Sequence, residues 1–288
     1  MATATLTADR RDHVSRYAVR ALDKADALGV IPTPLDQVAS GLGLAPAGNL
    51  FDDDVPPELA ARLKRLCGKV RGALWTRDRK ILLDRGQELP EARFAHGHEI
   101  GHGGLPWHSR AYSGDGGRTL DPDSAAELEA EASAFGADLV FNMGTFTNQA
   151  HSGNLGLASP LKLAPVYQAS LHASIRRYVE DSPRPCALLI LGRDLVVREG
   201  KPALAVQQGM ESASFKERYG PVSQCFPDDL RIDQWSFVHD AYEIVHGTPD
   251  SPITQGEVTA PTNRGRIRLR YEVFFNSYRC FVLLIPPA

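Results

Sequence analysis

Five consecutive residues, His98-Glu99-Ile100-Gly101-His102, constrain this chain more than any other segment. The H-E-x-x-H spacing places two imidazoles four residues apart, so on a helix both side chains project from one face. Two such histidines can bind a single metal ion, and the glutamate lies about 100° around the helix, where it can reach water rather than the metal. The motif therefore predicts a helix over residues 91–103 that carries a metal site with a general base beside it.

Polar residues that follow the motif are candidates for a third metal ligand, since a catalytic zinc ion usually takes three. The candidates are His108, Asp121, Asp123, Glu127, Glu129 and Glu131. A helix predicted over residues 124–141 allows a choice among the last three, because its apolar residues mark the buried direction. Glu127 points away from that direction, and Glu131 lies on the same side as Asp138, which we interpret as the solvated face.

Glu129 is the candidate that helix geometry favours. It shares a flank with Ser133 and Gly136, whose small side chains would let this helix pack closely against the histidine helix. A carboxylate with two imidazoles suits Zn²⁺ best, although Mn²⁺ or Fe²⁺ can bind the same ligand set. The sequence therefore predicts a metal site formed by His98, His102 and Glu129, with Zn²⁺ as the cofactor.

The two helices together resemble those of the ImmA/IrrE family of metallo-endopeptidases. Members of this family pair an H-E-x-G-H helix with a downstream helix that reads E-x-E-A-N-x-F-A. The matching segments here are residues 98–102 and residues 129–136, within a looser likeness over residues 18–142. Ser133 stands where the family usually has Asn, and Phe141-Asn142 stands where it usually has Met-Pro. The resemblance implies that the first glutamate of the second motif, Glu129, completes the metal site.

The same resemblance implies a zinc-dependent endopeptidase. Its substrate would be a cytoplasmic helix-turn-helix repressor, cleaved so that stress-response or mobile-element genes become active. In the mechanism that the motif indicates, Glu99 accepts a proton from water activated by zinc, and another side chain stabilises the oxyanion. Tyr112 and His108, in the loop between the two helices, are the candidates for this second catalytic role. The edge strand of the hairpin that contains Lys80–Asp84 would bind the substrate in extended form.

The order of helical and extended segments predicts an α+β fold with three parts. Residues 1–145 would form a mainly helical, zincin-like peptidase domain with a small sheet, which includes a hairpin over residues 70–84. Residues 146–183 would form a helical connector similar to a helix-turn-helix. Residues 184–288 would form a strand-rich α+β domain with a regulatory or sensor-like role.

Local patterns in the N-terminal half refine this outline. Residues 48–54 predict a polar break, and Pro56 is well placed to start a helix. Either Asp123 or Ser124 would cap the second helix of the site. Residues 144–156 predict a linker because they are polar and rich in glycine.

The C-terminal part is rich in strand patterns. Residues 186–191 and 195–197 are two strand candidates. Apolar residues alternate with Arg266, Arg268, Arg270 and Glu272, which predicts a strand with one wet face. Asn276-Ser277 would turn the chain into a final apolar strand over residues 278–285.

The composition excludes several other classes of protein. The 288 residues include 32 basic and 35 acidic side chains, so there is no positive excess to neutralise phosphates, and we do not expect direct DNA binding. The four cysteines are far apart and predict neither a disulfide framework nor a thiolate zinc site. No apolar run approaches the ~18 residues of a membrane helix, and the N-terminus has no hydrophobic signal core. We therefore expect a cytoplasmic protein with no membrane partner.

A non-proteolytic regulator is the alternative interpretation. The metal site would then be structural, and the connector would act as a scaffold or bind DNA, with His172, Arg176 and Arg177 facing phosphates. A structural zinc site is normally closed by four protein ligands, whereas these motifs offer three and a general base. The ligand count favours the peptidase.

Overall fold

The computed structural model describes residues 6–50, 71–75, 78–108, 121–246 and 253–287. The protein has an α+β fold that divides into two compact units. Unit 1 consists of residues 1–146 and 164–170, and unit 2 consists of residues 147–163 and 171–288. The predicted helix start at Pro56 and most of the loop expected between the two site helices lie outside the described residues.

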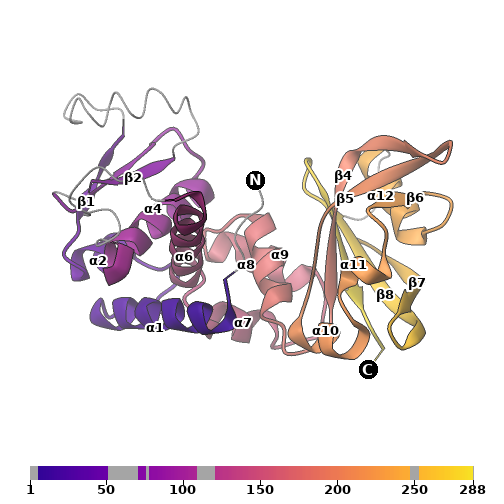
Figure 1. The fold of residues 1–288 in the computed structure, drawn as a ribbon, viewed down its shortest axis with the longest axis horizontal. Coiled ribbons are helices and arrows are strands. Elements are labelled where there is room, and N and C mark those ends of the chain that lie inside the picture. The colour runs from indigo at the N-terminus through magenta and orange to yellow at the C-terminus, as the bar shows by residue number, and fades with distance from the viewer. Residues whose placement is uncertain (1–5, 51–70, 76–77, 109–120, 247–252, 288) are drawn as a thin grey trace. The chain divides into compact units, whose positions relative to one another are not determined.

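Unit 1 combines a three-stranded sheet with the helices that carry the candidate site (Figure 1). Its helices are α1 (Ala8–Lys24), α2 (Leu35–Gly41), α4 (Leu89–Gly104) and α6 (Pro122–Val140), and its strands are β1 (Ala45–Asn49), β2 (Gly72–Trp75) and β3 (Lys80–Leu83). The two predicted site helices correspond to α4 and α6. Strands β2 and β3 pair in antiparallel fashion, so the predicted hairpin is confirmed.

The predicted polar break over residues 48–54 is wrong at its start, because residues 48 and 49 belong to strand β1. Residues 45–49 pair in parallel with β3, which becomes the central strand in the order β1-β3-β2. A Cβ atom added to Gly48 would lie 3.0 Å from Cε of Lys80, so this glycine lets the strand lie close to its neighbour. The strand depends on a pairing partner that is distant in sequence, and local composition does not show it.

Helices α4 and α6 pack backbone to backbone at a row of glycines. A Cβ atom added to Gly101 would lie 2.9 Å from the carbonyl oxygen of Ala132, and one at Gly97 would lie 3.1 Å from Cα of Gly136. One at Gly136 would lie 2.7 Å from the backbone nitrogen of His98. Larger side chains here would force the helices apart, because protein interiors have no spare volume at such contacts. The close approach expected at Gly101 and Gly136 is confirmed.

The N-terminus of α6 is capped by Asp121 rather than by Asp123 or Ser124. The Asp121 carboxylate accepts a hydrogen bond from the Ser124 amide at 3.0 Å. Pro122 therefore occupies the first helical position, where no amide donor is needed. Hydrogen bonding from Ser124 also lowers the pKa of Asp121.

Glu131 and Asp138 contradict our assignment of a solvated face on α6. Their exposed fractions are only 2% and 0%. Asp138 accepts two hydrogen bonds from the Arg11 guanidinium at 2.6 Å each and one from the Ser15 hydroxyl at 2.8 Å, and Glu131 lies 3.6 Å from Arg10. Helix α1 therefore covers this face, and its arginines compensate the buried negative charges.

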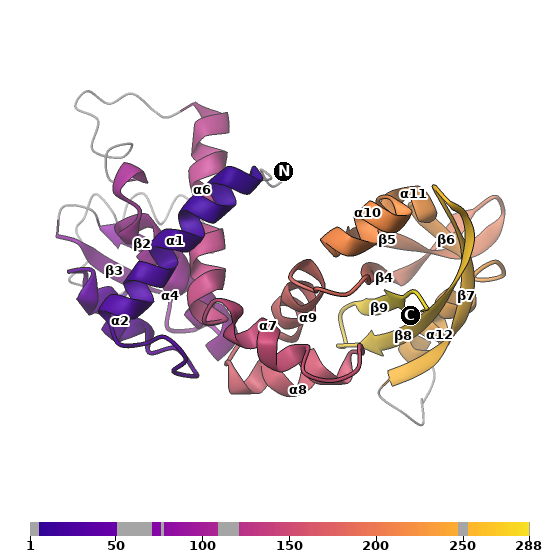
Figure 2. The same cartoon turned by 90° about the horizontal axis from the view of Figure 1, so that it is seen from below.

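Unit 2 is built around a curled six-stranded antiparallel sheet in the order β6-β5-β4-β9-β8-β7 (Figure 2). The strands are β4 (Ala187–Arg198), β5 (Lys201–Glu211), β6 (Asp229–Arg231), β7 (Ile253–Thr262), β8 (Gly265–Phe275) and β9 (Cys280–Ile285). The helices α10 (Ala213–Tyr219), α11 (Val222–Cys225) and α12 (Ser236–His246) accompany them. The final hairpin is confirmed as β8 and β9, whereas residues 186–191 and 195–197 belong to one strand, β4.

The large sheet buries apolar side chains on both faces. Leu189 of β4 lies in one core cluster with Phe215 of α10 and Phe237 of α12. On the opposite face, the ring of Phe281 of β9 contacts the His172 ring edge to face at 5.5 Å between centroids. The central strands are therefore covered on both sides, which explains their nearly continuous apolar sequence.

The connector is helical throughout most of its length. It consists of α7 (Gly144–Ala150), α8 (Ala158–Val166) and α9 (Leu171–Glu180), so the prediction of a linker from residue 144 is wrong for α7. Phe146 is fully buried between the rings of Phe141 and Tyr167, at centroid distances of 4.7 and 5.2 Å, and this contact anchors α7. No described helix, those of the connector included, is long and apolar enough to cross a membrane.

The polar face of strand β8 is less exposed to solvent than its alternating pattern predicts. Glu272 is only 4% exposed. Its carboxylate accepts hydrogen bonds from the Leu157 amide at 2.7 Å and from the Arg270 guanidinium at 2.6 Å. The segment that leads into α8 covers this end of the strand, so Glu272 is an internal link rather than a solvated residue.

Candidate metal centre

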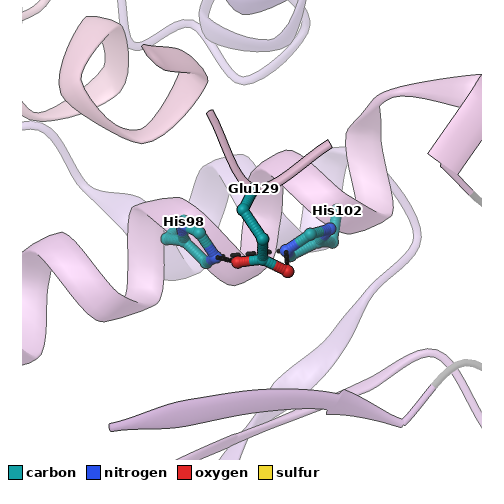
Figure 3. Close-up of side chains that lie close together, drawn as sticks. All are labelled: His98, His102 and Glu129. Carbon is teal, nitrogen blue, oxygen red and sulfur yellow. Dashed lines mark hydrogen bonds and ion pairs between the residues drawn. The ribbon is translucent and has the colours of Figure 1, made fainter. Parts of the chain in front are cut away.

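Three side chains from the two packed helices converge on one point (Figure 3). His98 and His102 come from α4, and Glu129 comes from α6. The two imidazole Nε2 atoms are 3.1 Å apart, and the Glu129 carboxylate oxygens lie 3.2 Å from Nε2 of His98 and 3.5 Å from Nε2 of His102. These residues form a group that could hold a metal ion, and they are the three ligands that the sequence predicts.

The spacing of the ligand atoms fits a small tetrahedral cation. Ligands about 2.0 to 2.2 Å from Zn²⁺ in tetrahedral geometry lie roughly 3.3 to 3.6 Å from one another. The distances between the facing atoms here range from 3.1 to 3.5 Å. The two ring nitrogens and the carboxylate all present electron pairs to the same point. A cation placed there would be attracted to all three, so the donor set suits a divalent metal ion.

Both histidines are hydrogen-bonded through the ring nitrogen that faces away from this point. Nδ1 of His98 lies 3.2 Å from the Ser133 hydroxyl, and Nδ1 of His102 lies 3.0 Å from Nδ1 of His108. Such contacts fix the orientation of a ligand ring and leave Nε2 for the metal. Ser133, expected only as a small residue at the helix contact, therefore also holds His98.

His108 is buried behind His102, with an exposed fraction of 0%. Its Nε2 atom lies 2.9 Å from Oε2 of Glu131, which also accepts a hydrogen bond from the Trp107 indole at 2.6 Å. This position suits support of His102 better than contact with a substrate oxyanion. Tyr112, the other oxyanion candidate, lies outside the described residues.

Glu99 lies between α4 and strand β2 and is 7% exposed. The backbone amide of Leu74 donates to its carboxylate, and a Cβ atom at Gly72 would lie 3.0 Å from its Cγ, so the glycine makes room for it. Burial raises the pKa of Glu99, although the nearby His98 and His102 act in the opposite direction. A buried carboxylate with a raised pKa is suited to accept and return a proton.

The protonation of the other groups follows from burial and from their neighbours. Burial lowers the pKa of His98, but hydrogen bonding with Glu129 and the charges of Glu99 and Glu129 outweigh it and raise the pKa. Hydrogen bonding from His102 and His98 lowers the pKa of Glu129. Burial lowers the pKa of His108 to about 4. Near neutral pH, Glu129 is therefore ionised and His108 is neutral.

The strand nearest the general base is β2 rather than β3. In the described sheet β3 is central and β2 lies at the edge, so the free edge of the predicted hairpin is Gly72–Trp75 and not Lys80–Leu83. Leu74, which binds Glu99, belongs to this edge strand. A chain that pairs with β2 would therefore run beside the site.

Of two residues near the site, Glu131 was wrongly placed on the solvated face from the sequence, and Trp107 was not considered. Glu131 was misplaced because helical periodicity identifies a solvated side only where no other element covers it, and α1 covers this one. The available signal was Trp107, which directly precedes His108. A buried indole N–H needs an acceptor, and Glu131 provides it.

The three residues considered for DNA contact each have a partner within unit 2. The ring of His172 contacts the ring of Phe281. Arg176 pairs with Glu180 at 2.9 Å, and Arg177 pairs with Asp181 at 2.5 Å. Arg177 is only 9% exposed. These positions describe a packed helix of unit 2 with little free positive charge.

Comparisons with known proteins bear on the fold. No known protein family matches the chain, and no curated protein matches it. Among solved structures, a Mycobacterium tuberculosis transcriptional regulator is similar, with a TM-score of 0.50 and 13% sequence identity over 96% of this chain and 77% of that one. At this identity the likeness concerns the fold alone.

Proposed function

We propose that unit 1 is a metal-dependent endopeptidase. The observation that carries the proposal is the convergence of His98, His102 and Glu129 next to the buried carboxylate of Glu99. Three protein ligands leave a coordination position for water or substrate, as catalytic sites require. The resemblance of both helices to the ImmA/IrrE family supports a peptide bond as the target.

Zn²⁺ is the metal that we propose, with Mn²⁺ and Fe²⁺ as alternatives for the same ligands. His98, His102 and Glu129 would hold it through Nε2, Nε2 and the carboxylate. When bound, Zn²⁺ supplies a Lewis acid that polarises a carbonyl group and lowers the pKa of water. The fit of the ligand spacing to a tetrahedral ion supports this choice.

Glu99 is the proposed general base and general acid. The amide of Leu74 holds its carboxylate, and Gly72 packs against its stem, so its position is restricted. Because burial raises its pKa, the carboxylate can take a proton from the attacking water and pass it to the leaving amine.

An extended peptide is the form of substrate that suits this sheet. The free edge of β2 offers backbone groups for pairing, and Leu74 on that strand contacts the general base. A peptide paired with β2 would pass the reacting groups with its backbone held in register. By family resemblance we propose a helix-turn-helix transcriptional repressor as the physiological substrate and unit 2 as a regulatory domain.

The test is a Glu99→Gln variant compared with wild type and with Glu91→Gln, an exposed glutamate on the same helix. Each protein is incubated with the repressor encoded nearby, with and without a chelator, and fragments are identified by mass. We expect Glu99→Gln to keep its metal and its fold but to lose about 10²- to 10⁴-fold in cleavage rate. Cleavage that persists in this variant, or in chelated wild type, would refute the proposal.

A non-proteolytic regulator is the competing proposal, in which the metal site is structural. It predicts that Glu99→Gln retains full regulatory function in cells and that wild type yields no fragments. On α9, Arg177 is nearly buried beside Asp181 and the more exposed Arg176 is paired with Glu180, so this alternative has little unpaired positive charge there to support it. We therefore prefer the peptidase.

A further inference from the structure

A buried chain of hydrogen bonds runs from Glu131 through His108 to His102. Glu131 and His108 are 2.9 Å apart, and His108 and His102 are 3.0 Å apart. We propose that Glu131 and His108 are positioning residues that set the tautomer of His102 and thereby the metal affinity of the site. The proposal rests on the metal-binding part of the proposed function and is independent of peptide hydrolysis.

The direction of each hydrogen bond follows from the carboxylate. Oε2 of Glu131 accepts from the Trp107 indole and is therefore an acceptor, so Nε2 of His108 carries the proton between them. A neutral imidazole has a single N–H, so Nδ1 of His108 must be an acceptor. The proton between the two histidines then belongs to Nδ1 of His102. Its Nε2 atom, which faces His98 and Glu129, can then present a lone pair to a metal ion.

The surroundings of Glu131 keep it an acceptor. The Trp107 indole donates to Oε2 at 2.6 Å, and the Arg10 guanidinium lies 3.6 Å from Oε1. Both groups offer only donors, and the carboxylate that faces them is 2% exposed. With water excluded from the chain, each hydrogen bond strongly restricts the tautomers of its neighbours.

The two histidine ligands differ in this respect. His98 faces the Ser133 hydroxyl, which can donate or accept and therefore does not impose a tautomer. His102 faces a chain that ends in a carboxylate and allows only one arrangement. The relay thus favours the form of His102 that binds metal through Nε2.

Asp138 provides a matched control. Like Glu131, it is a buried carboxylate of α6 that faces an arginine of α1, but its hydrogen bonds lead to Arg11 and Ser15 and not to the metal ligands. The experiment compares His108→Leu, Glu131→Gln and Asp138→Asn in the full chain. Zn²⁺ affinity is measured by chelator competition, and thermal unfolding of each metal-free protein verifies the fold.

We expect His108→Leu and Glu131→Gln to weaken Zn²⁺ binding by about 10- to 100-fold, the range of such supporting contacts, and Asp138→Asn to leave it unchanged. His108→Asn, whose amide oxygen can accept from His102, should recover part of the loss. Unchanged affinity in both folded relay variants, or an equal loss in Asp138→Asn, would overturn the proposal.

A second measurement uses wild type alone and holds even if the variants fail to fold. In ¹⁵N NMR spectra of the Zn²⁺-loaded protein, we expect His102 to bind metal through Nε2 and to show a slowly exchanging Nδ1 proton. Metal on Nδ1 of His102 would overturn the relay. Wild type that binds no Zn²⁺ would instead overturn the metal site of the proposed function.

Discussion

Buried charge is distributed differently in the two units. Among the described residues, the buried histidines and charged side chains of unit 1 are His96, Glu99, His102, His108, Glu131 and Asp138, and those of unit 2 are Arg177 and Glu272. Four of the six in unit 1 belong to the candidate site or its hydrogen-bond chain. Both in unit 2 are paired with groups of the connector or of the sheet.

This difference separates a polar interior from an apolar one. Burying a polar group destabilises a fold unless its hydrogen bonds are complete. In unit 1, His102, His108 and Glu131 are linked to one another, and Asp138 is held by Arg11 and Ser15. Unit 2 buries an apolar cluster between its sheet and α10, α11 and α12. We therefore expect mutations in the polar interior of unit 1 to change metal binding first, and mutations in the core of unit 2 to change stability alone.

The largest effect should come from Phe237→Ala in unit 2. Phe237 is fully buried and its ring contacts those of Phe226, Trp235 and Tyr271. Loss of the ring should lower the free energy of unfolding by about 3 to 5 kcal/mol. Denaturant unfolding measures this change, and Zn²⁺ affinity should stay at the wild-type value. If Phe237→Ala also lowered Zn²⁺ affinity, the expectation that the core of unit 2 affects stability alone would be wrong.

Replacement of Glu129 by Gln tests the metal site of unit 1. An amide lacks the negative charge of the carboxylate, so metal affinity should fall by more than the roughly 100-fold upper range of a supporting contact. Chelator competition measures the affinity. Glu127→Gln is the control, because Glu127 is half exposed on the same helix and pairs with Arg10. Metal binding within tenfold of wild type in Glu129→Gln would rule out Glu129 as a ligand.

Metal affinity should also decrease as the pH is lowered. The raised pKa of His98 means that a proton competes with the metal at and somewhat above the ordinary histidine pKa of about 6.5. Below the raised pKa, each unit of pH should weaken apparent affinity about tenfold. Glu129, whose pKa is lowered, stays ionised in this range and adds no further loss. Chelator competition from pH 8 to pH 5 checks the profile, and a constant affinity down to pH 6 would contradict it.

The smallest effect is expected for Arg176→Ala in unit 2. Arg176 pairs with Glu180 four residues later, and both side chains are about 40% exposed or more. Such an exposed pair contributes about 0.3 to 0.5 kcal/mol to the free energy of unfolding. Thermal unfolding at low and at high salt should show a small change that salt removes. If Arg176→Ala instead abolished regulation in cells without affecting stability, the DNA-binding alternative would regain support.

The parts of the structure that the sequence predicts are those set by local spacing. The H-E-x-x-H interval fixes His98 and His102 on one face of α4. Ser133 and Gly136 mark the flank of α6 that approaches it, so Glu129 follows from the sequence. The same holds for the two hairpins, whose strands pair with close neighbours in the chain.

The parts that the sequence does not predict depend on partners far away in the chain. Strand β1 exists because β3 pairs with it. Glu131 and Asp138 look solvated until the arginines of α1 are placed beside them, and Glu272 looks solvated until Leu157 donates to it. Each of these three carboxylates is buried because a compensating group of another segment lies beside it.

The glycine contact between α4 and α6 bears on which ion the site selects. Gly97, Gly101 and Gly136 let the two backbones approach closely, so the backbones largely set the spacing of the ligand atoms. We expect a methyl group added there to move Glu129 away from both rings, so that the proposed site would suit a larger cation. Residues that touch no ion would thus decide the ionic radius that the proposed site accepts.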